Sequence, residues 1–446
     1  MSITKSFKTW LLAIVAGGIL VLPQQPALAT TSSIDYKQLR LFRQVMRIVQ
    51  KNYVKEVSDK DLIQGAIKGM LEALDPHSAF MTPDLFKELQ VETKGEFGGL
   101  GIEITLDNGV LTIVSPIEDT PADKAGLKPG DKITKINGES TKNITLLKAV
   151  QKMRGPAGSK VTITIVREGV RGEKEYPLVR AIIHVKSVKK EMLESGYPYV
   201  RIANFQESTD TDLTSLIESL GEDEGIKGMV LDLRNNPGGL LDQAVKVANL
   251  FIDQGLIVYT DGRVKDQRME FRATRTGKHF KFKIACLINK GSASASEIVA
   301  GALQDRDRAV IFGSKSFGKA SVQTIIPLDD GEGLKLTTAY YYTPKGRHIQ
   351  KTGILPDMDL EADAKKQEDE LDEETKGDKK RQDKSRLLKK YKVDPEQDIV
   401  LRKALEWLKS DVSVKDYKAE LQQKQKAPLP DTALSTEPPS HESKTE

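Results

Sequence analysis

The chain has 446 residues, more than one ordinary domain holds, so we expect about two to four compact units. Hydrophobic residues make up 38% of the chain and charged residues 30%, which indicates real cores together with extended solvated segments. The 68 basic and 64 acidic residues give a formal charge of +4 with interspersed signs. This balance excludes the basic footprint of a nucleic-acid-binding protein.

The first 29 residues have the pattern of a secretory signal peptide. Lys5 and Lys8 precede an apolar run over residues 10–22, and Ala-Leu-Ala at 27–29 supplies a cleavage site. The run is short for a spanning helix, so we expect cleavage after Ala29, with an uncleaved inner-membrane anchor as the alternative. Cleavage removes two lysines and no acids, which lowers the formal charge from +4 to +2. This interpretation predicts a periplasmic protein.

Residues 30–94 have the periodicity of a small helical module. Apolar side chains recur there at spacings of three and four residues. They are Leu39, Phe42, Val45, Met46, Ile48 and Val49 in one stretch and Ile63, Ile67, Met70, Leu71 and Leu74 in the next. Such stripes need a partner surface, so we expect this module to support a homodimer or a higher homo-oligomer. A turn at 75–78 follows, and we interpret His77 within it as structural.

Residues 95–180 change to a β-rich pattern. Strands are expected at 103–106, 110–114 and 161–167, and a helix at 146–153. The glycine-flanked turn Leu100-Gly101-Ile102 is expected to point backbone N–H groups at a terminal carboxylate, while the following strand pairs with the incoming peptide. This segment resembles a PDZ domain of the circularly permuted kind found in bacterial proteases. Arg154 is a candidate contact for the carboxylate or a gate residue, with an exposed ion pair as the alternative.

Residues 181–357 alternate between strand and helix patterns. The expected strands are 199–202, 229–233, 256–259, 284–288, 309–312 and 334–342, and the expected helices are 210–220, 241–252 and 298–303. Alternation of this kind predicts an α/β core with much parallel sheet and with functional loops at strand ends. The single cysteine, Cys286, lies inside an apolar strand, so we predict a buried core residue and no intrachain disulfide. His184, His279 and His348 lack the spacing of a zinc site.

Two loops of this core carry candidate chemistry. In the first, an apolar strand turns through Ser292-Ala293-Ser294-Ala295-Ser296-Glu297 into a helix. A serine at such a turn lies near free N–H groups and the positive end of the helix dipole, which suits an attacking oxygen. The alternative is a capping box formed by Ser294 and Glu297. The second loop, residues 313–323, presents Lys319 between small residues.

Together with Asp-Leu-Arg-Asn-Asn-Pro-Gly-Gly at 232–239, these loops resemble the carboxyl-terminal processing peptidases, or tail-specific proteases, over residues 36–357. The resemblance implies a Clp/crotonase-like protease core in a multidomain chain. It implies that Ser294 is the nucleophile, that Lys319 is its base and that Gln323 orients the lysine. It also implies an oxyanion hole from the backbone N–H groups of Gly239 and Ala295. No metal and no cofactor are implied.

One position departs from the family's pattern. Ala320 stands where many members have glycine after the lysine, and it adds a methyl group without removing a reacting group. A lysine base must be neutral, so we expect burial among Phe317, Gly318 and Ala320 to lower the pKa of Lys319.

These observations predict an exported Ser/Lys endopeptidase that recognises protein C-termini. The resemblance implies protein and peptide substrates with free C-termini, among them cell-wall enzymes and damaged periplasmic proteins, and a lipoprotein adaptor. One rival is an inactive PDZ scaffold, which would bind without cutting. Another is a crotonase-like acyl-CoA enzyme, which the export signal argues against because coenzyme A is intracellular.

The C-terminal part is polar and then helical. Residues 358–394 form a charged linker or arm, and residues 395–423 a helical segment whose apolar stripe we expect to pack on the N-terminal module. Residues 424–446 contain four prolines and are predicted to be disordered.

Overall fold

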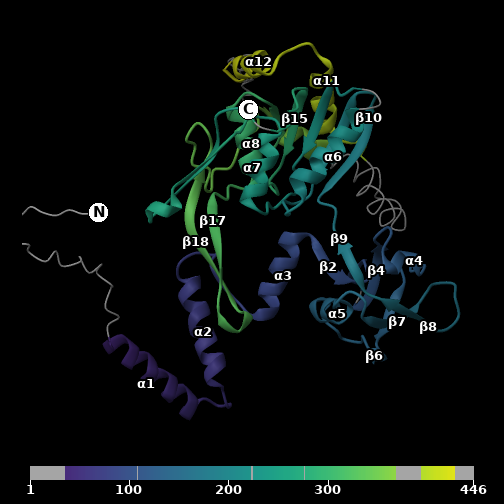
Figure 1. Cartoon of the computed structure of the whole chain (residues 1–446), viewed down its shortest axis with the longest axis vertical. Helices are drawn as coiled ribbons and strands as arrows, with labels where there is room; N and C mark the ends of the chain where they lie inside the picture. The colour runs from purple at the N-terminus through teal and green to yellow at the C-terminus, as the bar shows by residue number, and fades with distance from the viewer. Residues whose placement is uncertain (1–35, 108, 222–224, 276, 368–392, 427–446) are drawn as a thin grey trace, which may run out of the picture. The chain divides into compact units, whose positions relative to one another are not determined.

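The computed structural model describes residues 36–107, 109–221, 225–275, 277–367 and 393–426 (Figure 1). The predicted signal peptide, most of the charged arm and most of the predicted disordered tail lie outside these residues. The chain divides into two compact units, residues 1–69 and 70–446. None of the described helices is both long and apolar enough to cross a membrane.

The first unit contains α1 (Tyr36–Asn52) and the larger part of α2 (Asp59–Glu72). α1 has an apolar face at the predicted spacing, yet none of its residues is buried. Leu39, Phe42, Val45 and Ile48 are each between 43% and 52% exposed. Within the described residues of the first unit, this apolar face is therefore open.

The second unit begins with β1 (Ala79–Met81) and α3 (Pro83–Lys94), followed by a β domain. The β domain has a six-stranded sheet in the order β3-β4-β5-β7-β8, with β6 paired to β5. Its elements are β3 (Ile102–Asp107), β4 (Val110–Pro116), α4 (Pro121–Lys124), β5 (Lys132–Ile136), β6 (Glu139–Ser140), α5 (Leu146–Met153), β7 (Lys160–Val166) and β8 (Lys174–Val179). A separate two-stranded ribbon, β2 (Glu96–Gly99) with β9 (Ala181–His184), joins the ends of this domain.

The α/β core is built on a six-stranded sheet in the order β10-β11-β12-β15-β16-β19. All its pairs are parallel except β10 with β11, as the alternating pattern predicted. The strands are β10 (Val188–Glu194), β11 (Tyr197–Ile202), β12 (Gly228–Asp232), β15 (Lys283–Ile288), β16 (Val310–Gly313) and β19 (Met358–Asp359). The helices are α6 (Thr209–Gly221), α7 (Leu241–Asn249) and α8 (Ala295–Asp305).

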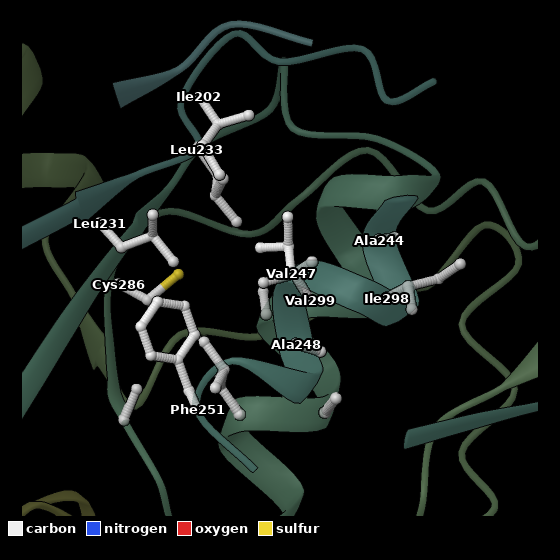
Figure 2. Close-up of a cluster of buried hydrophobic side chains, with 14 of the residues drawn as sticks. Ile202, Leu231, Leu233, Ala244, Val247, Ala248, Phe251, Cys286, Ile298 and Val299 are labelled. Carbon is white, nitrogen blue, oxygen red and sulfur yellow. The ribbon is translucent and has the colours of Figure 1, made fainter. Parts of the chain in front are cut away.

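The central strands are apolar on both faces because both faces are covered. On one face Leu231 and Cys286 pack with α6, α7 and α8, and Figure 2 shows Cys286 within this cluster. On the other face Val230 and Ala285 pack against α11 (Ile399–Lys409). A continuous apolar run is the sequence pattern expected of such a strand. The predicted burial of Cys286 is confirmed.

A second sheet was not expected. It is antiparallel, in the order β1-β18-β13-β14, with β17 also paired to β18. Its further strands are β13 (Leu256–Gly262), β14 (Met269–Arg272), β17 (Ser321–Pro327) and β18 (Gly333–Tyr342), with short 3-10 turns η1 (Lys265–Gln267) and η2 (Asp329–Gly331). The strand predicted at 256–259 therefore belongs to this sheet and not to the parallel one. Sequence periodicity predicts strands, but it does not decide which strands pair.

The expectation for the C-terminal helices was wrong. The apolar stripe of α11 packs on β12, β15 and β16 of the core and not on the N-terminal module. Trp407 lies against Phe312 of β16. A second helix, α12 (Val414–Lys426), follows and contributes Tyr417 to the same aromatic group. The sequence shows that this helix has an apolar stripe but does not show which surface it packs on, because any apolar surface of matching shape can bury it.

Candidate active site

Three loops meet at one edge of the parallel sheet. β12, β15 and β16 are adjacent strands. Their carboxyl ends lead into the glycine-rich loop (residues 232–239), the serine turn (292–297) and the lysine loop (313–323), respectively. This edge is where open α/β sheets place their binding sites.

Ser294 occupies a strained turn between β15 and α8. Its φ of 55° and ψ of −113° lie in a region that L-residues seldom adopt, and it stands at the N-cap position of α8. The turn presents the side chain at the positive end of the helix dipole. The neighbouring serines have different roles: Ser292 Oγ donates to Leu233 O at 2.8 Å and Ser296 Oγ donates to Asn236 O at 2.9 Å, and both are fully buried. Ser294 is only half-buried.

The glycine-rich loop lies directly against this turn. A Cβ added to Gly238 would come within 2.8 Å of Ser294 Cβ and within 3.1 Å of Ala295 N. Gly239 has a φ of 142°, and a Cβ there would collide with the backbone of Phe205. Glycine at both positions is therefore a steric requirement. Gly238 therefore lies against Ser294 and Ala295 N, and the assignment of Gly239 and Ala295 as the oxyanion pair stays a prediction.

A buried charge cluster anchors the start of this loop. Asp232 has no exposed surface, and its carboxylate accepts from Arg234 and from Tyr199 Oη at 2.7 Å. Arg234 also pairs with Asp398, the N-cap of α11, at 2.7 Å. Burial opposes ionisation of Asp232, but the Arg234 guanidinium and the hydrogen bonds hold its pKa below the usual value. The C-terminal helix thus completes the ion-pair cluster beneath the loop.

Glu297 connects the serine turn to the lysine loop. Its Oε2 accepts from Ser294 N at 2.8 Å and from Lys319 N at 2.9 Å. Its Oε1 accepts from Gly318 N at 2.7 Å and from Ser316 Oγ at 2.5 Å. The side chain is fully buried, and burial raises the pKa of its carboxyl although these four donors act to lower it. One carboxyl group therefore fixes the backbones of both predicted catalytic residues.

Tyr341 reinforces the same junction from the second sheet. Its hydroxyl lies 3.0 Å from Ser294 O and 2.5 Å from Lys319 O, so its single proton is shared between two carbonyl acceptors. Burial raises the pKa of Tyr341 well above its usual value, which keeps the hydroxyl protonated.

Lys319 is in an environment that favours its neutral form. Burial lowers the pKa of its ammonium group, the charge of Lys335 lowers it further, and Glu297 opposes the shift. Ala320 is buried in the core as expected, but Phe317 is 60% exposed. The expectation that Phe317 helps to bury the lysine was therefore wrong, because most of the Phe317 side chain is exposed.

Gln323 lies on β17, four residues after the lysine. Its amide nitrogen donates to Ser321 Oγ at 2.8 Å and lies 3.5 Å from Thr337 Oγ1. Within the described part of the chain, no hydrogen bond joins it to Lys319, so its orienting role stays a prediction.

The predicted peptide-binding turn lies at the edge of the β domain. Leu100 is buried in the domain core, and Gly101 has a φ of 74°. Their carbonyl groups accept from Ala122 N and Ile117 N, which fixes the turn. Ile102 opens β3, the edge strand of its sheet. Edge strands are the ones that add a peptide by β-pairing.

Arg154, the candidate gate residue, has local partners. Its guanidinium pairs with Glu88 of α3 and lies 4.4 Å from the centre of the Phe97 ring. The ion-pair alternative therefore describes its state in this structure.

The histidines have local packing roles. His184 pairs with Glu96, His279 contacts Asn249 O and His348 packs against Tyr342. Among the described residues, no group of three or more His, Cys, Asp or Glu is placed to hold a metal ion.

Sequence reasoning missed two residues of this site. Glu297 was considered only as a helix cap, although a carboxylate in an otherwise apolar helix start is itself a signal of a buried acceptor. Tyr341 carried no signal, because its contact with the site depends on the second sheet.

Replacing Glu297 should loosen both loops. Glu297→Ala leaves two buried donors (Ser316 Oγ and Gly318 N) and two part-buried donors (Ser294 N and Lys319 N) without their acceptor, and each buried group left unpaired costs about 1–3 kcal/mol. We expect the free energy of unfolding to fall by about 3 kcal/mol or more in urea denaturation, with faster hydrogen exchange at 294–297 and 316–320. Glu361→Ala, which removes an exposed ion pair with Lys290, is the control and should cost less than about 1 kcal/mol. Unchanged exchange in Glu297→Ala would contradict the joining role.

Three family models match the chain. Peptidase family S41 matches residues 196–360, a PDZ domain matches residues 112–167, and the N-terminal domain of the activating protease CtpB matches residues 22–84. The first two matches correspond to the α/β core and the β domain.

Relatives of known type extend over most of the chain. The carboxy-terminal-processing protease of Bartonella bacilliformis is 44% identical over 406 residues, which cover 88% of this chain and 93% of that protein. The carboxy-terminal processing protease CtpA of Bacillus subtilis is 37% identical over 348 residues, which cover 78% and 73%. Among solved structures, the photosystem II D1 C-terminal processing protease is 30% identical with a TM-score of 0.44, over 74% of this chain and 95% of that one.

The expected fold class is confirmed, and the acyl-CoA alternative is set aside. Identity of 44% over nearly the whole of both chains shows that this chain belongs to peptidase family S41, as a carboxy-terminal processing serine protease with a PDZ domain.

Proposed function

We propose that this protease is exported, cleaves with Ser294 as nucleophile and Lys319 as general base, and selects substrates through their C-termini. The observation that carries the catalytic part is the shared oxygen of Glu297, which accepts from the backbone N–H groups of both residues. This contact keeps the two residues together although 25 positions separate them in the sequence.

The proposed reaction has an acylation step and a deacylation step. Neutral Lys319 takes the hydroxyl proton as Ser294 attacks the substrate carbonyl. The N–H groups of Gly239 and Ala295 stabilise the negative charge that develops on the carbonyl oxygen. The amine product leaves with a proton from Lys319. Lys319 then takes a proton from water as the water attacks the acyl-enzyme, and it returns that proton to Ser294 as the bond between the serine oxygen and the acyl group breaks.

The pH dependence of cleavage should report the ionisation of Lys319. The pKa of Lys319 is lowered, so the neutral fraction at a given pH is larger than for an ordinary lysine, and kcat/KM should rise as the pH increases through that lowered value. Lys319→Ala and Ser294→Ala should each abolish cleavage of an unfolded protein substrate. Lys319→Arg should fail as well, because guanidinium does not deprotonate.

Lys315 is the matched control, because it is an exposed lysine of the same loop. Lys315→Ala should cleave at the wild-type rate with an unchanged pH profile. Cleavage by Lys319→Ala, in protein shown to be folded, would refute the Ser/Lys mechanism.

Recognition of C-termini is assigned to the turn Leu100-Gly101-Ile102 of the PDZ domain and to the edge strand that follows it. The relatives from Bartonella bacilliformis and Bacillus subtilis are carboxy-terminal processing proteases, which supports this choice. The carboxylate would accept backbone hydrogen bonds of the charge-assisted kind, each worth about 1.5–3 kcal/mol.

Amidating the C-terminus of a substrate peptide should therefore weaken binding to the intact Ser294→Ala protein by about tenfold or more. Fluorescence anisotropy with matched acid and amide peptides measures the difference. Equal affinity for the two peptides would remove the carboxylate from the recognition mechanism.

Export and substrates are part of the same proposal. Residues 1–29 have the pattern of a cleavable signal peptide, so the substrates are proteins of the periplasm. A lipoprotein adaptor would then present substrates to the enzyme at the membrane surface.

We also propose a homo-oligomer formed through α1. Its face of Leu39, Phe42, Val45 and Ile48 is exposed in the single chain and resembles an unpaired helix interface. Replacing Phe42 and Val45 with aspartate should reduce the mass measured by light scattering to that of one chain. Replacing the exposed Lys51 of the same helix with aspartate is the control and should leave the mass unchanged. A wild-type protein that is already monomeric would refute the proposal.

A further inference from the structure

The turn at residues 75–78 is tied to the strand that borders the lysine base. The carboxylate of Asp75 accepts from His77 N at 2.7 Å, from Ser78 N at 2.9 Å and from Ser78 Oγ at 2.8 Å. It also accepts from Thr337 Oγ1 on β18 at 3.2 Å. A turn that sequence analysis interpreted as a break between helices is therefore fixed onto the second sheet.

Two further contacts hold the turn in register with β18. Thr337 N donates to Ser78 Oγ at 3.1 Å. Ala79, the first residue of β1, pairs with Lys335 in an antiparallel ladder. The position of Thr337 relative to Asp75 is thus set by backbone pairing as well as by the side chains.

Thr337 contacts Gln323 as well as Asp75. The two residues are direct partners in the ladder of β17 and β18, and Gln323 Nε2 lies 3.5 Å from Thr337 Oγ1. Asp75 is ionised and accepts only, so the Thr337 hydroxyl must use its proton on Asp75. Its lone pairs then face the amide nitrogen of Gln323, and this polarity decides which way the amide is turned.

We propose that Asp75 is a positioning residue for the lysine base, acting through Thr337 on the amide of Gln323. With its nitrogen held by Thr337 and Ser321, Gln323 has its oxygen left to accept from the amine of Lys319 when substrate is bound. The amine then keeps its lone pair for the Ser294 proton. This inference rests on the proposed Ser/Lys mechanism.

The charges near the base agree with a geometric role. The charged groups that act on the pKa of Lys319 are Lys335 from β18 and Glu297 from α8, while Lys319 itself acts on the pKa of His77 in the turn. Burial and the nearby lysines lower the pKa of His77, so its ring is neutral at the pH where a lysine base works. Asp75 is the charged group of the turn, but the pKa of Lys319 is shifted by burial, Lys335 and Glu297, so we assign Asp75 a role through its hydrogen bonds.

The test compares variants of the full mature chain on one unfolded protein substrate. Thr337→Val removes the hydroxyl and keeps the shape, and we expect kcat to fall about three- to tenfold with KM unchanged. Thr337→Ser restores the hydroxyl and should recover most of the loss. Thr338→Val is the control: it removes the neighbouring hydroxyl, which bonds only to Thr324 among the described residues, and should leave kcat unchanged.

A double-mutant cycle separates positioning from general stability. In a Gln323→Ala background, Thr337→Val should cause no further loss of kcat, because the residue it acts through is gone. Asp75→Ala should behave like Thr337→Val. Asp75→Asn keeps the oxygen that accepts from Thr337 and should retain most of the activity.

The outcomes are distinguishable. Wild-type kcat in Thr337→Val, no recovery in Thr337→Ser, or an equal loss in the Gln323→Ala background would overturn the positioning role. If Asp75→Ala does not fold, the Thr337 and Gln323 variants still test whether the hydroxyl of Thr337 acts on the lysine base through Gln323. Activity in Lys319→Ala would instead refute the mechanism on which the inference rests.

Discussion

A single buried carboxyl group, that of Glu297, makes the active site one structure. The serine turn belongs to the parallel sheet, whereas the lysine loop leaves that sheet and enters the antiparallel one. Glu297 and the hydroxyl of Tyr341 each contact both loops, and these shared contacts join the two sheets at the active site. Four donors converge on Glu297 from the serine turn and the lysine loop, and Phe317 N of the lysine loop also donates to Ser292 O of the serine turn. A buried acceptor with four donors also restrains the positions of both loops strongly, because moving a loop away would leave donors unpaired, and each unpaired buried donor raises the free energy of the folded state.

The catalytic loops lie at a junction of two sheets, which explains why so many constraints meet there. The parallel sheet supplies the strand ends that place the glycine-rich loop and the strained serine. The antiparallel sheet supplies Tyr341, Lys335 and the environment of Gln323. The neutral lysine required for catalysis depends on both, since burial comes from the core and the neighbouring positive charge comes from β18.

Much of the secondary structure was predictable, because the apolar periodicity of a helix or strand does not depend on which surface the element packs against. β11, β12, β15 and β16 of the core sheet and α6, α7 and α8 were predicted to within a few residues, whereas β10 and β19 were not predicted, and the predicted burial of Cys286 was correct. The errors have a common cause. Phe317 was expected to bury the lysine, and the α11 stripe was expected on the N-terminal module, yet a hydrophobic residue does not specify which surface it meets. The second sheet was missed for the same reason, because strand pairing is a long-range choice.

The sequence by itself determined the family, the order of the domains and the candidate residues Ser294 and Lys319, since these follow from local motifs and their order. Only the tertiary structure decided how those residues are held. It showed that the buried carboxylate of Glu297 accepts from both catalytic loops as well as capping α8. It also showed that Arg234 forms an ion pair with Asp398, near the C-terminal end of the chain, and that Asp75 accepts a hydrogen bond from Thr337 of β18. The physical reason is that each contact joins groups distant in sequence, whose approach depends on packing that no local pattern encodes.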